Sequence, residues 1–326
     1  MMPRSLKILL KGLVSALIIY YLFSTISLDL ARKVLQDVRF EYLLFAGILY
    51  FLGQMLSAYK WSLIARPLGF ERSYRDFFSY YFIGMFFNLF MLGSIGGDVV
   101  KAFYLSSGRR DLVSAGYSIF LDRFTGGLAL VSILCLASLL EMWRGVFPLF
   151  IFLLVLLVTS IVWAVTVLTP RLLDALSFFK RLAWRLGFQR LKVFWDSPRI
   201  ILLPLLISFV FQAAFVLIVF TVGKGFGMNV PLRYFFVFVP ISDLLSVLPI
   251  TVNGLGLREG IYVFFLKRLG VETSAAVMFS FASTAVVWAV SLVGGGLYML
   301  KDRGLSSSLK KGGFREREDE HSASGP

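Results

Sequence analysis

The stretch LPITVNGLGLREG, residues 248–260, interrupts one of the most apolar parts of this 326-residue chain. It combines a proline, an asparagine and three glycines with the adjacent charges of Arg258 and Glu259. With its apolar flanks it covers residues 232–268. The second apolar arm, of about 10–13 residues, reaches about 15–20 Å as a helix, which is short of the roughly 30 Å hydrocarbon core of a membrane. The pattern predicts a re-entrant helical hairpin, which enters and leaves the membrane on the same side.

Residues 77–106 have the same organisation, with an apolar arm, a glycine-rich break and a short second arm. The remaining long apolar segments predict full-length spanning helices. We place these at residues 8–26, 42–64, 111–140, 146–168, 199–223 and 272–300. Hydrophobic residues make up 58% of the chain, more than the roughly half that is usual in soluble domains. The sequence therefore predicts an all-α polytopic membrane protein with about six full spanning helices and two re-entrant hairpins.

Basic residues between the apolar segments predict which side each loop faces, because cytoplasmic loops are rich in lysine and arginine. Residues 171–199 hold seven basic residues against two acids, and three basic residues, Arg4, Lys7 and Lys11, lie before or at the start of the first span. With both hairpins re-entrant, every strongly basic loop lies on one face. We therefore expect a cell (inner or plasma) membrane protein with both termini in the cytoplasm. The hairpins then enter from opposite faces, each before a long helix, which outlines an inverted-topology repeat.

The chain is predicted to form a single transmembrane domain over residues 1–302, followed by a disordered polar tail over residues 303–326. Within the domain, residues 171–195 carry apolar and basic residues on opposite sides at helical spacing. This pattern favours an amphipathic helix that lies on the inner membrane surface and contacts anionic lipids. A cytoplasmic connector packed on other helices is the alternative.

The net charge of +14 comes largely from basic residues between apolar segments, so it favours topology signals and anionic head groups over nucleic-acid binding. The single cysteine, Cys135, lies in an apolar segment, and the single histidine, His321, lies in the tail. These counts exclude an internal disulfide and cysteine or histidine metal clusters. We therefore expect no metal site and no cofactor.

Seven charged residues fall at membrane depth. They are Asp98, Lys101, Asp122, Arg123, Asp243, Arg258 and Glu259. Each costs about 2.5–3.5 kcal/mol at the centre of the bilayer, so seven facing lipid would cost roughly 20 kcal/mol. That exceeds the stability of most domains, which is about 5–15 kcal/mol. The seven residues must therefore face the protein interior, where four acids and three bases can pair.

The positions of three of these charges suggest partners. Adjacent residues on a helix point about 100° apart, so Asp122 and Arg123 should pair with other helices rather than with each other. Bracing of the fold and a role along the substrate path are equal alternatives for them. For Asp243 we expect Arg123 or Lys101 as the partner.

The first glycine-rich break, GSIGGDVVKAF at residues 93–103, places Gly96 and Gly97 at the start of a helix, with Asp98 in its first turn and Lys101 three residues later. Free backbone N–H groups at a helix start attract anions. These four residues are therefore candidates for a phosphate-binding tip. The alternative is a turn that needs glycine, with Asp98 as a helix cap and Lys101 extending to the membrane surface.

The second break, residues 248–260, also places glycines before charged residues, but these are an arginine and a glutamate. Gly254 and Gly256 permit close backbone approach, and Asn253 offers an amide. Arg258 presents a planar guanidinium suited to a phosphodiester, and Glu259 can orient it or meet an amine of the head group. The alternative is a buried Arg258–Glu259 pair that locks the hairpin.

The motifs GSIGGDVVKAFYL and LPITVNGLGLREG together resemble the flippase-like transmembrane region of lysylphosphatidylglycerol synthases, over about residues 5–302. The first departs from the family pattern at Lys101, where arginine is frequent, and the second at Leu255, where glycine is usual. The resemblance implies a polytopic inner-membrane protein that moves or handles phospholipid or polyprenyl-linked head groups. Synthase members also carry a large soluble aminoacyl-transferase domain, whereas here only a short tail follows the last apolar segment.

We therefore expect a lipid translocator rather than an enzyme, with an anionic head group bound in a polar cavity between the two hairpin tips. The expected partner is a membrane lipid, and a homo-oligomer is compatible with the sequence. Two alternatives stay open: an integral-membrane transferase acting on a lipid-linked substrate, and a lipid-binding assembly partner that transports nothing.

Overall fold

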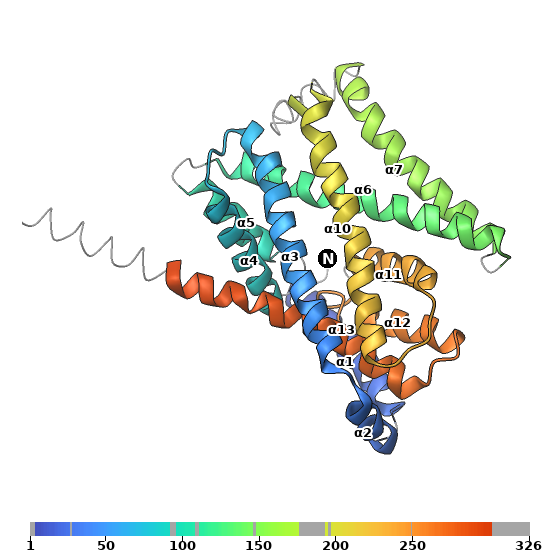
Figure 1. Ribbon diagram of the computed structural model, residues 1–326. Helices are drawn as coiled ribbons and strands as arrows, with labels where there is room; N and C mark the ends of the chain where they lie inside the picture. Colours follow the sequence, from blue (N-terminus) through green and yellow to red (C-terminus); the bar gives the residue numbers. More distant parts are fainter. Residues whose placement is uncertain are drawn as a thin grey trace, which may run out of the picture.

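The computed structural model describes residues 4–26, 28–91, 96–107, 111–145, 148–175, 193–194, 197–248 and 250–301, and within these it is helical without strands (Figure 1). Five helical stretches are long and apolar enough to cross a membrane: Phe40–Leu68, Leu112–Trp143, Leu149–Leu168, Arg199–Gly225 and Thr273–Lys301. They coincide with five of the six predicted spans, which confirms the polytopic all-α fold. The sixth predicted span, residues 8–26, falls largely on α1 (Arg4–Ser24), in which Lys11–Ser24 is an apolar stretch.

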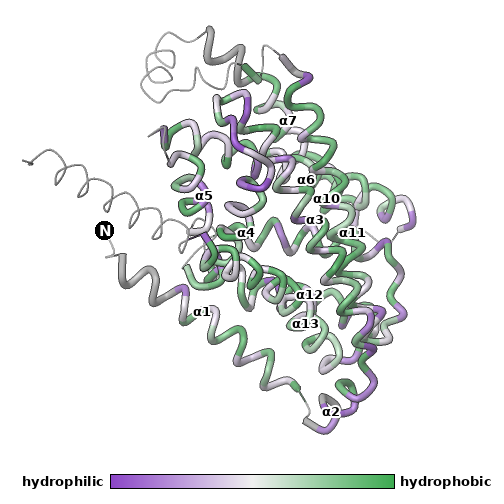
Figure 2. The backbone as a smooth tube through the Cα atoms, turned by 60° about the vertical axis from the view of Figure 1, so that its left-hand side comes forward, coloured by the Kyte–Doolittle hydropathy of each residue, from purple (hydrophilic) through white to green (hydrophobic). Residues whose placement is uncertain are grey.

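The long helices form the frame of the molecule. They are α3 (Phe40–Ala65), extended by the short η1 (Arg66–Leu68), α6 (Leu112–Trp143), α7 (Leu149–Ala175), α10 (Pro198–Gly225) and α13 (Thr273–Ser291), which residues 293–301 continue. α3 and α10 pack against each other along the centre (Figure 1). α7 packs on α6, is the least buried of the five and is almost entirely hydrophobic (Figure 2), as expected for a helix that faces lipid. The amphipathic α2 (Leu28–Asp37), which was not predicted, packs on α13.

Two pairs of short helices occupy the predicted hairpin positions. The first pair is α4 (Tyr74–Phe90) with α5 (Gly96–Ser106), and the second is α11 (Leu232–Ser246) with α12 (Leu257–Arg268). The second arms have 11 and 12 residues, so each is about 16–18 Å long at 1.5 Å per residue. Each is therefore too short to cross a bilayer alone, as predicted.

The tips of the two helix pairs meet. In the second turn the backbone is left-handed at Asn253, with φ 51°, and at Gly254, with φ 76°. This turn directs the Asn253 amide to the end of α4, where Nδ2 donates to the carbonyl oxygens of Asn88, at 2.5 Å, and Met91, at 3.1 Å. Helix α1 closes the other side of the turn, because the Ser15 hydroxyl accepts from Val252 N–H at 2.9 Å.

The helices repeat one packing pattern twice. α3 packs on α4, α4 on α5 and α5 on α6, just as α10 packs on α11, α11 on α12 and α12 on α13. The last long helix of each half packs on the first two helices of the other half. Thus α13 packs on α3 and α4, and α6 packs on α10 and α11. The same order of helix packing in both halves, and the same contacts between them, agree with the predicted repeat of two related halves.

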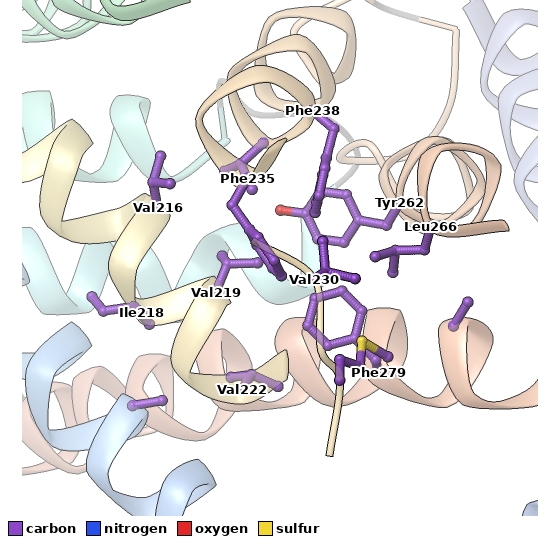
Figure 3. Packing of buried hydrophobic residues seen from close by; sticks show 14 of the residues in the cluster. Val216, Ile218, Val219, Val222, Val230, Phe235, Phe238, Tyr262, Leu266 and Phe279 are labelled. Carbon is purple, nitrogen blue, oxygen red and sulfur yellow. The ribbon is translucent and has the colours of Figure 1, made fainter. Parts of the chain in front are cut away.

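Among the described residues, the largest apolar core is formed mainly by helices of the second half, with contributions from α1, α3 and α4. Phe235 and Phe238 of α11, Tyr262 of α12 and Phe279 of α13 pack together against valines of α10 (Figure 3). All four aromatic side chains are at most 1% exposed. This packing fixes α11 and α12 to the long helices and so fixes the position of their tip.

Two sequence predictions lie largely outside the described residues. α7 continues to Ala175, and residues 176–192 and 195 of the predicted surface helix are not described. The predicted tail, residues 303–326, is not described either. Both stay predictions.

The crossing of α4 and α5 provides a stability test. A Cβ at Gly97 would lie 2.0 Å from the Gly84 carbonyl oxygen and 2.6 Å from Asn88 Cγ. We expect Gly97→Ala to lower the free energy of unfolding by at least about 1–3 kcal/mol, as overpacking does. The matched control is Gly116→Ala on α6, where a Cβ meets nothing within 4 Å. Melting temperatures of both purified variants in detergent measure the difference, and equal melting temperatures would contradict the close crossing.

Candidate functional site

A polar cavity lies where the two helix pairs meet the long helices. Two overlapping parts of it have volumes of about 360 and 560 Å³, within the range of ligand sites. Both parts are lined by Gln54 of α3, Arg123 of α6, Gln212 of α10 and Asp243 of α11. The cavity is therefore lined by both halves of the chain, and its lining includes Asn88 and Asn253 at the two tips.

One group of charges fastens α5 to α6. Asp98 accepts a hydrogen bond from Arg123 Nε and lies 3.2 Å from Lys101 Nζ. As predicted, Arg123 pairs with another helix and not with its neighbour Asp122. One carboxylate thus serves two cations, and both of these cations line the cavity.

Lys101 does not extend to a surface. It is 5% exposed, and Nζ lies 4.4 Å from the centroid of the Tyr81 ring and 5.6 Å from that of Trp61. Aromatic faces attract cations, so these rings and Asp98 hold the ammonium charge at the wall of the cavity. The alternative of a lysine reaching to the membrane surface is wrong.

Lys60 forms a second group that the sequence reasoning missed. Its Nζ lies 3.0 Å from Asp122 Oδ1, 2.9 Å from the Asp122 carbonyl oxygen and 3.2 Å from the Ser208 hydroxyl. The side chains of Lys60 and Asp122 are 8% and 6% exposed. This buried pair ties α3 to α6 and α10 and confirms that Asp122 pairs across helices. The available signal was a lysine inside the predicted span 42–64.

Asp243 and Arg258 form the third group, within the second helix pair. Arg258 Nε lies 3.6 Å from Asp243 Oδ1. The expected partners of Asp243, Arg123 and Lys101, are thus wrong. Arg123 and Lys101 both pair with Asp98. Asp243 pairs instead with Arg258, which the turn between α11 and α12 brings close to it.

Glu259 is 1% exposed and does not form the alternative lock with Arg258. Its carboxylate accepts from Gly256 N–H at 2.7 Å and from the Thr284 hydroxyl of α13. It lines only a small pocket of about 50 Å³ beside the main cavity. Glu259 thus caps α12, where the positive end of the helix stabilises its charge.

Asp98 and Glu259 occupy equivalent positions in the two halves. Asp98 is the third residue of α5, which begins at Gly96, and Glu259 is the third residue of α12, which begins at Leu257. Their partners Arg123 and Thr284 are each the twelfth residue of the following long helix. Both acids therefore brace a short helix against its long neighbour.

The remaining predicted site residues lie in the turns. Gly97 N–H donates to Asn88 Oδ1 at 2.7 Å, so a side chain already occupies this amide of the first tip. Gly96 faces Met91, since a Cβ there would lie 2.3 Å from Met91 Cβ. Asn253 lines the cavity, Gly254 lines the small adjoining pocket, and Gly256 packs against α1.

A further ionic cluster, also missed, lies outside the cavity. Glu141 near the end of α6 is 2% exposed and pairs with Arg144 Nη1 at 2.7 Å and with Arg233 Nε of α11 at 3.8 Å. In the other half, Lys301 pairs with Asp76 of α4 at 3.3 Å. In each half the end of the long helix is thus joined to the start of the opposite helix pair. Basic residues between apolar segments predict topology, but they do not predict these partners.

Comparison with known proteins gives a limited match to one relative. A UPF0104 membrane protein of Methanocaldococcus jannaschii is 32% identical over 97 residues, which cover 29% of this chain and 28% of that protein. The chain thus spans little more than a quarter of the length of this relative in the match. This similarity is to another membrane protein and assigns no activity.

The family match covers most of the chain and agrees with the two glycine-rich breaks and the helices around them. The model of the lysylphosphatidylglycerol synthase transmembrane region matches residues 8–295. All three ionic groups of the cavity and both helix pairs fall inside this range. The chain therefore belongs to the family of the lysylphosphatidylglycerol synthase transmembrane region.

Proposed function

We propose that the protein translocates an anionic phospholipid or polyprenyl-linked lipid, whose head group passes through the central cavity while its tails stay in the bilayer. In this proposal the protein is a translocator and not an enzyme. It lies in the cell membrane with both termini in the cytoplasm, and the two helix pairs are re-entrant.

One observation carries the proposal, namely the charge of the cavity. Lys60, Lys101, Arg123 and Arg258 line it, against Asp122 and Asp243 at its wall and Asp98 directly behind. Among the described residues the cavity thus has four cations and three carboxylates. Glu259 is capped separately and lines only the adjoining pocket. A surplus cation in a region of low dielectric constant favours a ligand with a single negative charge.

The location of the cavity also favours transport. It lies between two structurally related halves, as substrate sites do in transporters with inverted repeats. Of the sequence candidates, we propose that Arg258, Arg123, Lys101 and Asn253 face the head group. Asp98, Asp122 and Glu259 position the cations and helices, and Gly96, Gly97, Gly254 and Gly256 shape the tips.

The test is lipid movement in proteoliposomes that contain fluorescent phosphatidylglycerol. The native chain is expected to move the lipid. Arg258→Ala should slow the movement by about 10- to 100-fold, which corresponds to the loss of a charged hydrogen bond. The matched control is Arg268→Ala, which removes an exposed arginine at the other end of α12 and should leave the rate unchanged. No movement by the native chain across a panel of anionic and polyprenyl-linked lipids, or equal rates for Arg258→Ala and the native chain, would contradict the proposal.

A further inference from the structure

The Asp243–Arg258 pair differs from the other ion pairs of the cavity. Its closest separation is 3.6 Å, whereas Lys60–Asp122 and Lys101–Asp98 are at 3.0 and 3.2 Å. A donor and an acceptor 3.6 Å apart do not form a direct hydrogen bond. The two charges are near enough to attract each other, but each keeps its hydrogen-bonding capacity.

Two further polar groups beside this pair also lack a partner within the protein. Asp243 Oδ1, Ser246 Oγ, Asn253 Oδ1 and Arg258 Nε are all buried atoms without a protein hydrogen bond. All four residues line the same part of the cavity, of about 360 Å³. Buried polar atoms are nearly always hydrogen-bonded in folded proteins, so four together on one wall indicate a ligand site. We call these four residues the donor–acceptor wall.

The orientation of Asn253 is fixed by its other contacts. Its Nδ2 faces two carbonyl oxygens, those of Asn88 and Met91. A carbonyl accepts only hydrogen, so the NH₂ group must point there. The Asn253 Oδ1 atom is therefore a buried acceptor without a protein partner, on a residue that lines the cavity.

The donor–acceptor wall is not part of the repeated scaffold. Asp243 is the twelfth residue of α11 and Arg258 the second residue of α12. The residues at the same positions of α4 and α5 are Met85 and Gly97, neither of which is charged. The bracing acids, in contrast, occur in both halves. The fold thus forms this kind of helix pair without such a wall.

The wall offers two donors, Arg258 Nε–H and the Ser246 hydroxyl, and two acceptors, Asp243 Oδ1 and Asn253 Oδ1. An anion without O–H or N–H groups can accept hydrogen bonds from the two donors, but it donates none to the two acceptors and is repelled by the Asp243 carboxylate. A phosphodiester whose head group carries O–H or N–H groups satisfies both kinds. We propose that the wall selects head groups that carry hydrogen-bond donors beside the phosphate, over head groups of equal charge that carry none. This inference rests on the proposed function and specifies its substrate class.

The test compares lipids of equal charge in the same proteoliposomes. Phosphatidylglycerol and phosphatidylmethanol both carry one negative charge, but only the first has hydroxyl groups on its head group. The native chain should move phosphatidylglycerol at least about tenfold faster, because a buried carboxylate left without its donor disfavours the analogue. Phosphatidylethanolamine should likewise be preferred over phosphatidylcholine, which has no N–H.

Two variants test whether the preference for phosphatidylglycerol over phosphatidylmethanol depends on the donor–acceptor wall. Asp243→Ala should remove most of it, and Ser246→Ala, a smaller change that keeps the ion pair, should reduce it severalfold. The control is Ser291→Ala, because Ser291 lines the same cavity but donates to the Val287 carbonyl at 2.8 Å. Titration with water-soluble glycerophosphoglycerol tells whether the wall also binds a head group without tails.

The outcomes separate the two proposals. A preference in the native chain that Asp243→Ala and Ser246→Ala diminish supports the inference. Equal movement of phosphatidylglycerol and phosphatidylmethanol overturns it and leaves the translocator in place. Movement and binding of none of these lipids overturns both. A preference that neither wall variant changes overturns the assignment to these residues.

Discussion

Replacing Lys60 with methionine is expected to lower the free energy of unfolding by about 3–5 kcal/mol, because it leaves a buried carboxylate without its counter-charge. Lys60 is the cation next to Asp122, whose side chain is 6% exposed. It also holds the Asp122 carbonyl and the Ser208 hydroxyl, so α3, α6 and α10 all lose a contact. A surface ion pair would be worth only about 0–1 kcal/mol.

The double replacement Lys60→Met with Asp122→Leu distinguishes a buried ion pair from a simple packing defect. It removes both charges, and apolar replacements of a buried pair are often neutral or stabilising. The double variant should therefore be more stable than the single Lys60→Met variant. Thermal unfolding of the three proteins in the same detergent gives the comparison. A single variant within about 1 kcal/mol of the native protein would show that the pair is solvated.

Gly127→Leu is expected to stop lipid movement almost completely while the protein stays folded. Gly127 lies on α6 and lines the larger part of the cavity, of about 560 Å³. A Cβ built there meets nothing within 4 Å, so a side chain enters open space without displacing a neighbour. A leucine should then occupy the space that the head group needs, whereas Gly127→Ala should retain much of the rate.

The matched control for this substitution lies on the same helix. Gly116 of α6 is exposed, lines no part of the described cavity, and also leaves a Cβ without neighbours within 4 Å. Gly116→Leu should therefore leave the transport rate unchanged. Both leucine variants are compared with the native chain in the proteoliposome assay, at equal protein incorporation. Normal movement by Gly127→Leu would place the lipid path outside this cavity.

The helices and the helix pairs were predictable from the sequence because they depend on local patterns. Long apolar runs predicted the spans, and the glycines within 93–97 and 254–256 marked where each short second arm begins, at Gly96 and Leu257. The resemblance carried by the same breaks was confirmed by the family match over residues 8–295. The sixth predicted span, residues 8–26, falls largely on α1 (Arg4–Ser24), whose part from Lys11 to Ser24 is apolar.

The partners of the charged residues were predictable only in part. The 100° angle between neighbours correctly separated Asp122 from Arg123, because this follows from helix geometry alone. The partner of Asp243 depends on how α11 and α12 pack, and Lys60 meets Asp122 across 62 positions of sequence. No local pattern specifies such contacts. The structure also gives Glu259 a capping role, which a charge count at membrane depth does not reveal.

The most direct test of head-group entry into the cavity is the accessibility of a cysteine at position 127. The protein for this measurement carries Gly127→Cys together with Cys135→Ala, which removes the natural thiol, and is reconstituted in vesicles. A membrane-impermeant thiol reagent should modify this cysteine, and added phosphatidylglycerol should slow the modification severalfold, while a cysteine at Gly116 should react equally with and without the lipid. Modification at position 127 that is the same with and without anionic lipid, or no modification there at all, would contradict the passage of the head group through this cavity.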